Sequence, residues 1–149
     1  MRRPLDGVTV VALEQVIAGP FCTRQLAELG ARVIKIERPE GGDQSRSMDR
    51  TVQGLSSHFV WTNRSKESVA LDVKHPRAQE ILAKLLARAD VFVQNLAPGA
   101  VERLGLGNGA GETVEDEPLP LILVDMLGDQ LDHHVVGHQL PALHDVAGL

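Results

Sequence analysis

Residues 5–40, LDGVTVVALEQVIAGPFCTRQLAELGARVIKIERPE, decide the fold, because two apolar segments there flank one helical segment. The first apolar run, VTVVAL at residues 8–13, is short and continuous, which is typical of a strand buried on both faces. Gly19 and Pro20 open a helix, since proline suits the first helical turn. RVIKIE at residues 32–37 is rich in β-branched residues and predicts a second strand. This order predicts a parallel strand–helix–strand unit.

Two helices can be placed from their apolar residues. The helix between the two strands has Leu26 and Leu29 as its apolar stripe, and Gly30 stands where a C-terminal cap belongs. The clearest helix begins at Pro76, where five apolar residues follow the i, i+3, i+4, i+7, i+8 spacing of one buried face. These five residues are Ala78, Ile81, Leu82, Leu85 and Leu86.

Further strands continue the alternation. VALDV at residues 69–73 and DVFVQ at residues 90–94 lie on either side of the second helix, and PLILVD at residues 120–125 can add one more buried strand. A polar loop runs from Gly41 to about Gln53. The predicted fold class is therefore α/β, with a parallel Rossmann-like sheet and flanking helices.

Charge divides the chain into two parts. All 15 Lys and Arg residues lie at or before Arg103, whereas residues 104–149 carry eight carboxylates and four of the six histidines. Globular domains normally mix both signs over their surface. We therefore expect residues 1–106 to form one folding unit and residues 107–149 an acidic, His-containing tail that begins with a Gly-rich linker at 107–118.

Composition argues against several function classes. Aromatic residues make up only 3% of the 149 residues and the net charge is −5, so a base-stacking or basic nucleic-acid surface is not supported. No apolar run approaches the about 20 residues of a transmembrane helix. A single cysteine fits a reducing compartment. We therefore expect a cytoplasmic protein with neither a membrane nor a nucleic-acid partner.

Three segments in order carry a family resemblance. LDGVTVVALEQVIAGPFCTRQLAELGARVIKIERPEGGDQSR at residues 5–46 is followed by NRSKESVALDVKHP at 63–76 and DVFVQNLAPGAVERLGL at 90–106. Over roughly residues 4–106 the chain resembles the family III coenzyme A transferases, which include formyl-CoA and carnitine-CoA transferases and 2-methylacyl-CoA racemases. The resemblance implies an enzyme that moves CoA between carboxylic acids, takes CoA as substrate without a bound cofactor, and forms an interlocked homodimer.

The resemblance also implies that CoA binds at the carboxyl ends of the strands, where open α/β sheets generally take ligands. The implied CoA-binding residues are Ile17, Ala18, Arg38, Leu71, Asp72, Val73, Lys74, Asn95, Leu96, Ala97 and Arg103. Independently of the family, Arg38, Lys74 and Arg103 each follow a predicted strand end, and the phosphates of CoA call for such cations. The alternative is that these three bases are solvated surface charges.

The catalytic group that the resemblance implies is an Asp nucleophile, which forms a covalent acyl intermediate. In the family pattern this Asp follows a Gly-rich segment beyond the fifth strand, about where this chain ends. We therefore expect an N-terminal portion that is truncated, incomplete relative to the family fold and without a catalytic residue. A frameshift, a premature stop or a misjoined gene model would each explain the tail. The alternatives are a racemase-type isomerase and a non-catalytic CoA-ester-binding protein.

The tail offers only weak substitutes for the missing chemistry. Asp125 ends a predicted strand, where an aspartate more often makes a turn or cap. His138 stands in a faint version of the racemases' Gly-His-Asp segment, in which Gln139 replaces the Asp. His134 and His138, with His133 or Asp132, have metal-ligand spacing if helical. Gly137 and Pro141 disfavour that helix, so no metal site is expected.

Two residues in the first 40 also invite a functional interpretation. Cys22 near a helix N-terminus can have a lowered pKa, although a small buried apolar role is the better expectation. Glu37 at the end of the second strand suggests an acid that binds the ribose of a nicotinamide dinucleotide. The first turn reads EQVIAGPFC rather than G-x-G-x-x-G, which argues against that cofactor.

Overall fold

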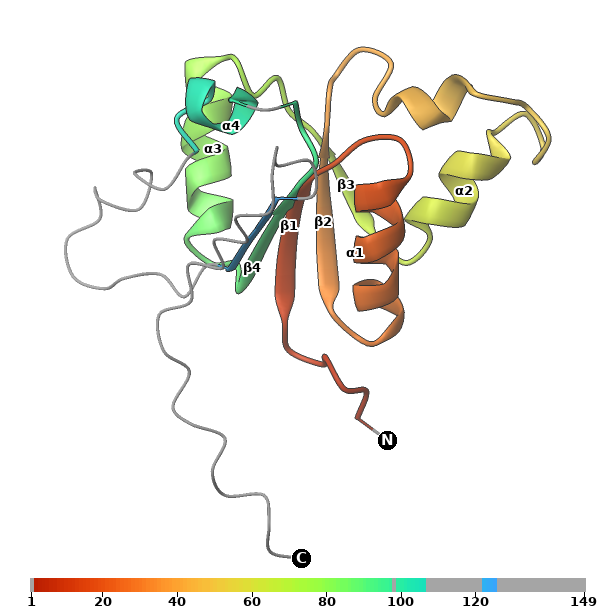
Figure 1. The fold of residues 1–149 in the computed structure, drawn as a ribbon, viewed down its shortest axis with the longest axis horizontal. Helices are drawn as coiled ribbons and strands as arrows, with labels where there is room; N and C mark the ends of the chain where they lie inside the picture. The colour runs from red at the N-terminus through yellow and green to blue at the C-terminus, as the bar shows by residue number, and fades with distance from the viewer. Residues whose placement is uncertain (1, 98, 107–121, 126–149) are drawn as a thin grey trace, which may run out of the picture.

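The computed structural model describes residues 2–97, 99–106 and 122–125, which form an α/β fold (Figure 1). Its elements in chain order are β1 (Thr9–Leu13), α1 (Ala18–Glu28), β2 (Arg32–Glu37), the 3-10 helix η1 (Gln44–Ser47), α2 (Ser57–Asn63), β3 (Glu67–Ala70), α3 (Pro76–Leu86), β4 (Val91–Gln94), α4 (Ala100–Arg103) and β5 (Ile122–Asp125). The five described strands pair in parallel. The predicted α/β class is confirmed.

The strand order places a crevice next to β1. The sheet runs β3-β2-β1-β4-β5, so the chain builds outward from β1 in one direction and then returns to its other side. The loops that follow β1 and β4 therefore leave the sheet at the point where the order reverses. Open α/β sheets bind ligands in the crevice at such a point, outside the carboxyl ends of the strands.

Both faces of the sheet are covered by helices, α1 and α2 on one side and α3 and α4 on the other (Figure 1). One core cluster contains buried residues of β1, β2, α3 and β4, and the opposite cluster combines the alternate strand residues with Ala27 of α1. Because successive strand side chains point to opposite faces, a strand buried on both faces is apolar throughout. This explains why the central strands were visible in the sequence.

The predicted limits of one strand are wrong, and two helix residues that were predicted to be buried are exposed. β3 spans Glu67–Ala70 rather than 69–73, because it pairs with residues 34–37 of β2 and has mostly exposed side chains. A strand of this kind gives no apolar run. Ile81 of α3 is 47% exposed and Leu29 after α1 is 45% exposed. The buried faces of these helices are narrower than the apolar spacing predicts.

Helices α2 and α4 were not predicted. The side-chain oxygen of Ser56 caps α2 by accepting a hydrogen bond from the amide of Phe59. The Asp49 carboxylate also accepts the Ser57 amide, at 2.9 Å. Ser56 is thus the sequence signal that identifies the start of α2. None of the described helices is long and apolar enough to span a membrane.

The predicted strand near residues 120–125 is present as β5, which pairs with β4. The linker expected at 107–118 lies outside the described residues. The division of the chain at residue 106 therefore stays a prediction.

Candidate functional site

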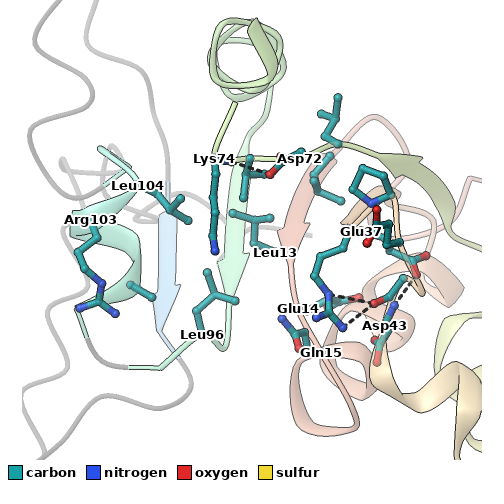
Figure 2. A pocket seen from close by; sticks show the side chains of 18 residues that line it. Leu13, Glu14, Gln15, Glu37, Asp43, Asp72, Lys74, Leu96, Arg103 and Leu104 are labelled. Atoms are coloured by element: carbon teal, nitrogen blue, oxygen red, sulfur yellow. Dashed lines mark hydrogen bonds between the residues drawn. The ribbon is translucent and has the colours of Figure 1, made fainter. Parts of the chain in front are cut away.

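A cleft of about 1030 Å³ opens at the carboxyl ends of the central strands (Figure 2). It brings together seven of the predicted site residues, Arg38, Leu71, Asp72, Val73, Lys74, Leu96 and Arg103. A second hollow of about 480 Å³ shares Gln15 and Leu96 with this cleft. Its lining includes the remaining predicted residues, Ile17, Ala18, Asn95 and Ala97. The eleven predicted residues therefore lie together in two adjoining hollows.

Three cations line the cleft without a described carboxylate partner. Among the side chains that the structure describes, none of Arg38, Lys74 and Arg103 takes part in an ion pair. Arg38 donates instead to the Gly42 carbonyl, from Nε at 3.3 Å and Nη2 at 3.1 Å. In Figure 2 the Lys74 side chain lies between Arg103 and the central strand β1. The cleft lining also includes five carboxylates, of which Glu14, Glu37 and Asp43 are held in ion pairs, so the three cations are available to an anionic ligand.

A buried ion cluster adjoins this cleft, whose lining includes the cluster's carboxylates Glu14 and Asp43. The Lys35 ammonium, 1% exposed, contacts Asp43 Oδ2 at 2.5 Å and lies 3.7 Å from Glu14 Oε1. Lys66 donates to Glu14 Oε1 at 2.6 Å and to the Pro20 carbonyl at 2.8 Å. Burial of its ammonium, opposed by Glu14, lowers the pKa of Lys66 to about 8. Every buried polar side-chain atom in the described residues has a partner, so this cluster fixes the surrounding loops.

Glu37 at the end of β2 is fully occupied by protein donors. Its carboxylate accepts Arg46 Nε at 2.7 Å and Nη2 at 2.8 Å, Ser68 Oγ at 2.7 Å and the Asp43 amide at 2.9 Å. Burial acts to raise the pKa of Glu37, but these hydrogen bonds lower it to about 2. Each carboxylate oxygen already accepts two hydrogen bonds, so neither has a free lone pair for a ribose hydroxyl. Glu37 therefore fixes the loop after β2, and the nicotinamide interpretation has no support here.

Sequence reasoning missed the residues that shape the loop after β1. Gln15 and Val16 line the second hollow, and their amides donate to Asn95 Oδ1 at 2.8 Å and Asp43 Oδ1 at 3.0 Å. A usable signal was present in β2, where RVIKIE places Lys35 in an otherwise apolar buried strand. A buried lysine requires a buried carboxylate partner, which the structure shows to be Asp43.

The other candidates from the sequence give no catalytic site in the described residues. Cys22 is half-buried, and burial, followed by the Glu14 charge, raises the pKa of its thiol rather than lowering it. Asp125 ends β5 opposite Gln94, and its side chain is outside the described set. The proposed histidine and aspartate ligands at residues 132–138 also lie outside it. Within the described residues no group of three His, Cys, Asp or Glu side chains is placed to hold a metal ion.

The chain belongs to CoA-transferase family III, whose family model matches residues 5–126. Over 106 residues it is 46% identical to succinyl-CoA:glutarate CoA-transferase of Mus musculus, covering 70% of this chain and 24% of that protein. It is 42% identical over 106 residues to formyl-CoA:oxalate CoA-transferase of Rhodopseudomonas palustris strain TIE-1, covering 70% of this chain and 25% of the relative. The family resemblance inferred from the sequence is confirmed, and the match continues past residue 106 through β5.

Solved structures agree with this assignment. The crystal structure of a CaiB/BaiF family protein from Brucella suis superposes with a TM-score of 0.73 at 32% identity, covering 84% of this chain and 33% of the other. A Mycobacterium tuberculosis protein described as hypothetical gives a TM-score of 0.73 at 35% identity, covering 83% and 33%. The chain thus spans about a quarter of the length of the curated relatives and about a third of the solved ones.

Proposed function

We propose that the described residues form the CoA-binding part of an enzyme that transfers coenzyme A between carboxylic acids. The observation that carries this proposal is the position of three cations, none ion-paired with a described side chain, in a cleft at the carboxyl edge of the sheet. That edge is where folds of this class bind ligands. The two relatives quoted above are named as CoA-transferases, which supports transfer rather than isomerisation.

The anionic end of CoA occupies the larger cleft in this proposal. CoA carries a 3′-phosphate and a diphosphate, and Arg38, Lys74 and Arg103 supply the charge-assisted hydrogen bonds that such groups require. The half-buried side chains of Leu71 and Val73 line the same cleft and offer apolar contact to the adenine. Each charge-assisted contact contributes about 1.5–3 kcal/mol where water is excluded.

The neutral pantetheine arm occupies the second hollow. Leu96 lines both hollows and connects them. Ile17, Ala18 and Ala97 give the second hollow a mostly apolar lining, which suits an uncharged arm better than a phosphate. The thioester end of the substrate then lies beside the loop after β1.

We also propose that the described residues of this chain do not provide a nucleophile for acyl transfer. Of the side chains that the structure describes, no carboxylate lines the second hollow. Glu14 and Asp43, which line the larger cleft, are held in buried ion pairs, and Glu37 is held by Arg46. Glu40 and Asp72 also line the larger cleft, where the nucleotide and not the thioester is placed. Without a carboxylate at the thioester, the described residues lack the covalent route.

An acyl-exchange assay tests the absence of a nucleophile. The chain should give no CoA exchange between acyl-CoA donors and carboxylate acceptors, even at high protein concentration. Turnover near the ~10 s⁻¹ of a typical enzyme would contradict this part of the proposal.

Calorimetric titration with CoA tests the binding site. Arg38→Ala and Arg103→Ala should each raise the Kd for CoA by about tenfold or more, because each removes one charge-assisted contact. Arg32→Ala is the matched control, since Arg32 is an exposed arginine at the opposite end of β2 and is paired with Glu67. Equal affinity in all four proteins would exclude the cleft as the CoA site.

The predicted homodimer and cytoplasmic location remain proposals. Phe21 of α1 and Trp61 of α2 stack with ring centroids 5.5 Å apart, although they are 39% and 46% exposed. Exposed aromatic pairs of this kind are enriched at protein interfaces, which supports the dimer. Sedimentation equilibrium should give twice the chain mass for the wild type and a lower mass for Trp61→Ala.

A further inference from the structure

The loop between β1 and α1 is held by side chains from two other loops. The Asn95 carboxamide accepts the Gln15 amide at 2.8 Å and donates to the Gln15 carbonyl at 2.9 Å. The Asp43 carboxylate accepts the Val16 amide at 3.0 Å. Three hydrogen bonds therefore join the loop after β1 to the loops after β4 and β2.

The geometry at Asn95 extends the sheet by means of a side chain. The last paired residues of β1 and β4 are Leu13 and Gln94. Beyond them the Asn95 carboxamide offers Gln15 one donor and one acceptor, as the backbone of a neighbouring strand would. The pairing thus continues while the backbone after β4 is free to turn away.

Val16 has a backbone conformation that needs such support. Its φ is +66°, in the left-handed region that β-branched residues rarely adopt. Residues in such conformations persist where surrounding contacts fix them, and they cluster at functional sites. Asn95 holds the preceding residue, Gln15, and Asp43 holds the amide of Val16 itself.

Both supporting side chains make hydrogen bonds to the loop after β1. Asp43 is 2% exposed, and it also accepts Lys35 Nζ at 2.5 Å, the Ser45 amide at 2.8 Å and Ser45 Oγ at 2.9 Å. The Asn95 carboxamide makes its two hydrogen bonds to Gln15, and Asn95 also lines the second hollow. Both side chains therefore hold the loop in place.

We propose that Asn95 and Asp43 are positioning residues that hold residues 15–18 in the shape that receives the pantetheine arm of CoA. This inference rests on the proposed function and adds two residues that determine which part of the ligand is recognised. The cations that take the phosphates belong to the larger cleft, and the clamped loop lines the second hollow. Loosening the clamp should therefore weaken recognition of the arm and spare recognition of the nucleotide.

Gly19 provides an independent way to disturb the clamp. A Cβ added there would lie 2.9 Å from Glu14 Cβ, 3.0 Å from Asn95 Cγ and 3.2 Å from Asn95 Oδ1. Gly19 lies within α1 and is not among the glycines with positive φ. An alanine at this position therefore fits the helix backbone, and its Cβ presses on both Glu14 and the Asn95 carboxamide.

The test compares two ligands on the full chain by calorimetry, CoA and adenosine 3′,5′-bisphosphate, which has the nucleotide phosphates but no arm. Asn95→Ala and Gly19→Ala should each raise the Kd for CoA about tenfold, since both disrupt the two hydrogen bonds to Gln15. The Kd for the bisphosphate should change less than about twofold. Arg38→Ala is a control with the contrasting result, because it should weaken the binding of both CoA and the bisphosphate.

The outcomes separate the clamp from the binding site. A selective loss of CoA affinity supports the positioning role, and retained bisphosphate binding shows that the variant is folded. Equal losses for the two ligands, or no loss for either, would overturn the role of Asn95. If the unmodified chain bound neither ligand, the proposed function itself would fail, and the clamp with it.

Discussion

The carboxylate of Glu37 should account for much of the acid sensitivity of this protein. It is 7% exposed and accepts hydrogen bonds from Arg46, Ser68 and the Asp43 amide. These bonds keep the folded-state pKa of Glu37 at about 2, against 4.5 for an ordinary glutamate. A tenfold change in proton affinity corresponds to about 1.4 kcal/mol, so the ionised group stabilises the fold by about 3 kcal/mol.

The sign follows from the direction of the pKa shift. A carboxyl whose folded pKa is lowered contributes its full stability above the unfolded pKa, here 4.5, and loses it as the pH falls toward about 2. Glu37→Gln removes the titrating group while preserving its shape. The difference in unfolding free energy between wild type and variant should therefore be about 2 kcal/mol smaller at pH 3 than at pH 7.

Urea unfolding followed by circular dichroism measures this difference at each pH. Glu67→Gln is the control, because Glu67 also accepts two hydrogen bonds from one arginine, Arg32, at 2.8 and 2.9 Å. The Arg32–Glu67 pair is exposed, so its loss should change the free energy of unfolding little at any pH. If the Glu37→Gln curve ran parallel to that of the wild type from pH 7 to pH 3, the assigned role of Glu37 would be wrong.

Three further perturbations test the loops around the cleft. Lys35→Met should destabilise the protein by about 3–5 kcal/mol, because it leaves the buried Asp43 carboxylate without its cation; an unchanged urea midpoint would contradict this. Gly42→Ala should destabilise the fold by about 1–3 kcal/mol in thermal melts, because φ at Gly42 is +61° and the added Cβ would lie 2.6 Å from Glu37 Oε2. Gly41→Ala should destabilise it less, because a Cβ at Gly41 meets no atom within 4 Å. The lowered pKa of Lys66 makes folding more favourable as the pH rises from about 8 toward 10.5. The wild type should therefore gain unfolding free energy relative to Lys66→Met over that range. A difference in unfolding free energy that stayed constant with pH would refute the lowered pKa.

The sequence predicted the central sheet because its strands are buried on both faces. VTVVAL, RVIKIE and DVFVQ contain nearly continuous apolar runs, and each lies within one residue of the observed strand limits. β3 was misplaced because most of its side chains are exposed. Its position is determined by pairing with β2, and that contact between distant residues leaves no local pattern in the sequence.

Some residues of the candidate site could be predicted from the sequence and others could not. Residues that follow strand ends, such as Arg38 and Lys74, could be located because the topology brings all carboxyl ends to one edge. The roles of Asn95 and Asp43 could not be read from the sequence, since they depend on hydrogen bonds to residues 80 and 27 positions away. Neither the strained φ of Val16 nor the buried ion cluster has a signature in residue spacing.

Titration of a ¹⁵N-labelled chain with CoA, followed by nuclear magnetic resonance, reports on the backbone amides of the whole sheet at once. We expect the largest chemical-shift changes in residues 15–18, 38–43, 71–74, 95–97 and 99–104, at the carboxyl edge of the sheet. The amide resonances of Thr9 and Arg32, at the opposite edge, should not shift. Shifts centred on that opposite edge, or no shifts at millimolar CoA, would contradict the proposal that this part of the chain is a CoA-binding site.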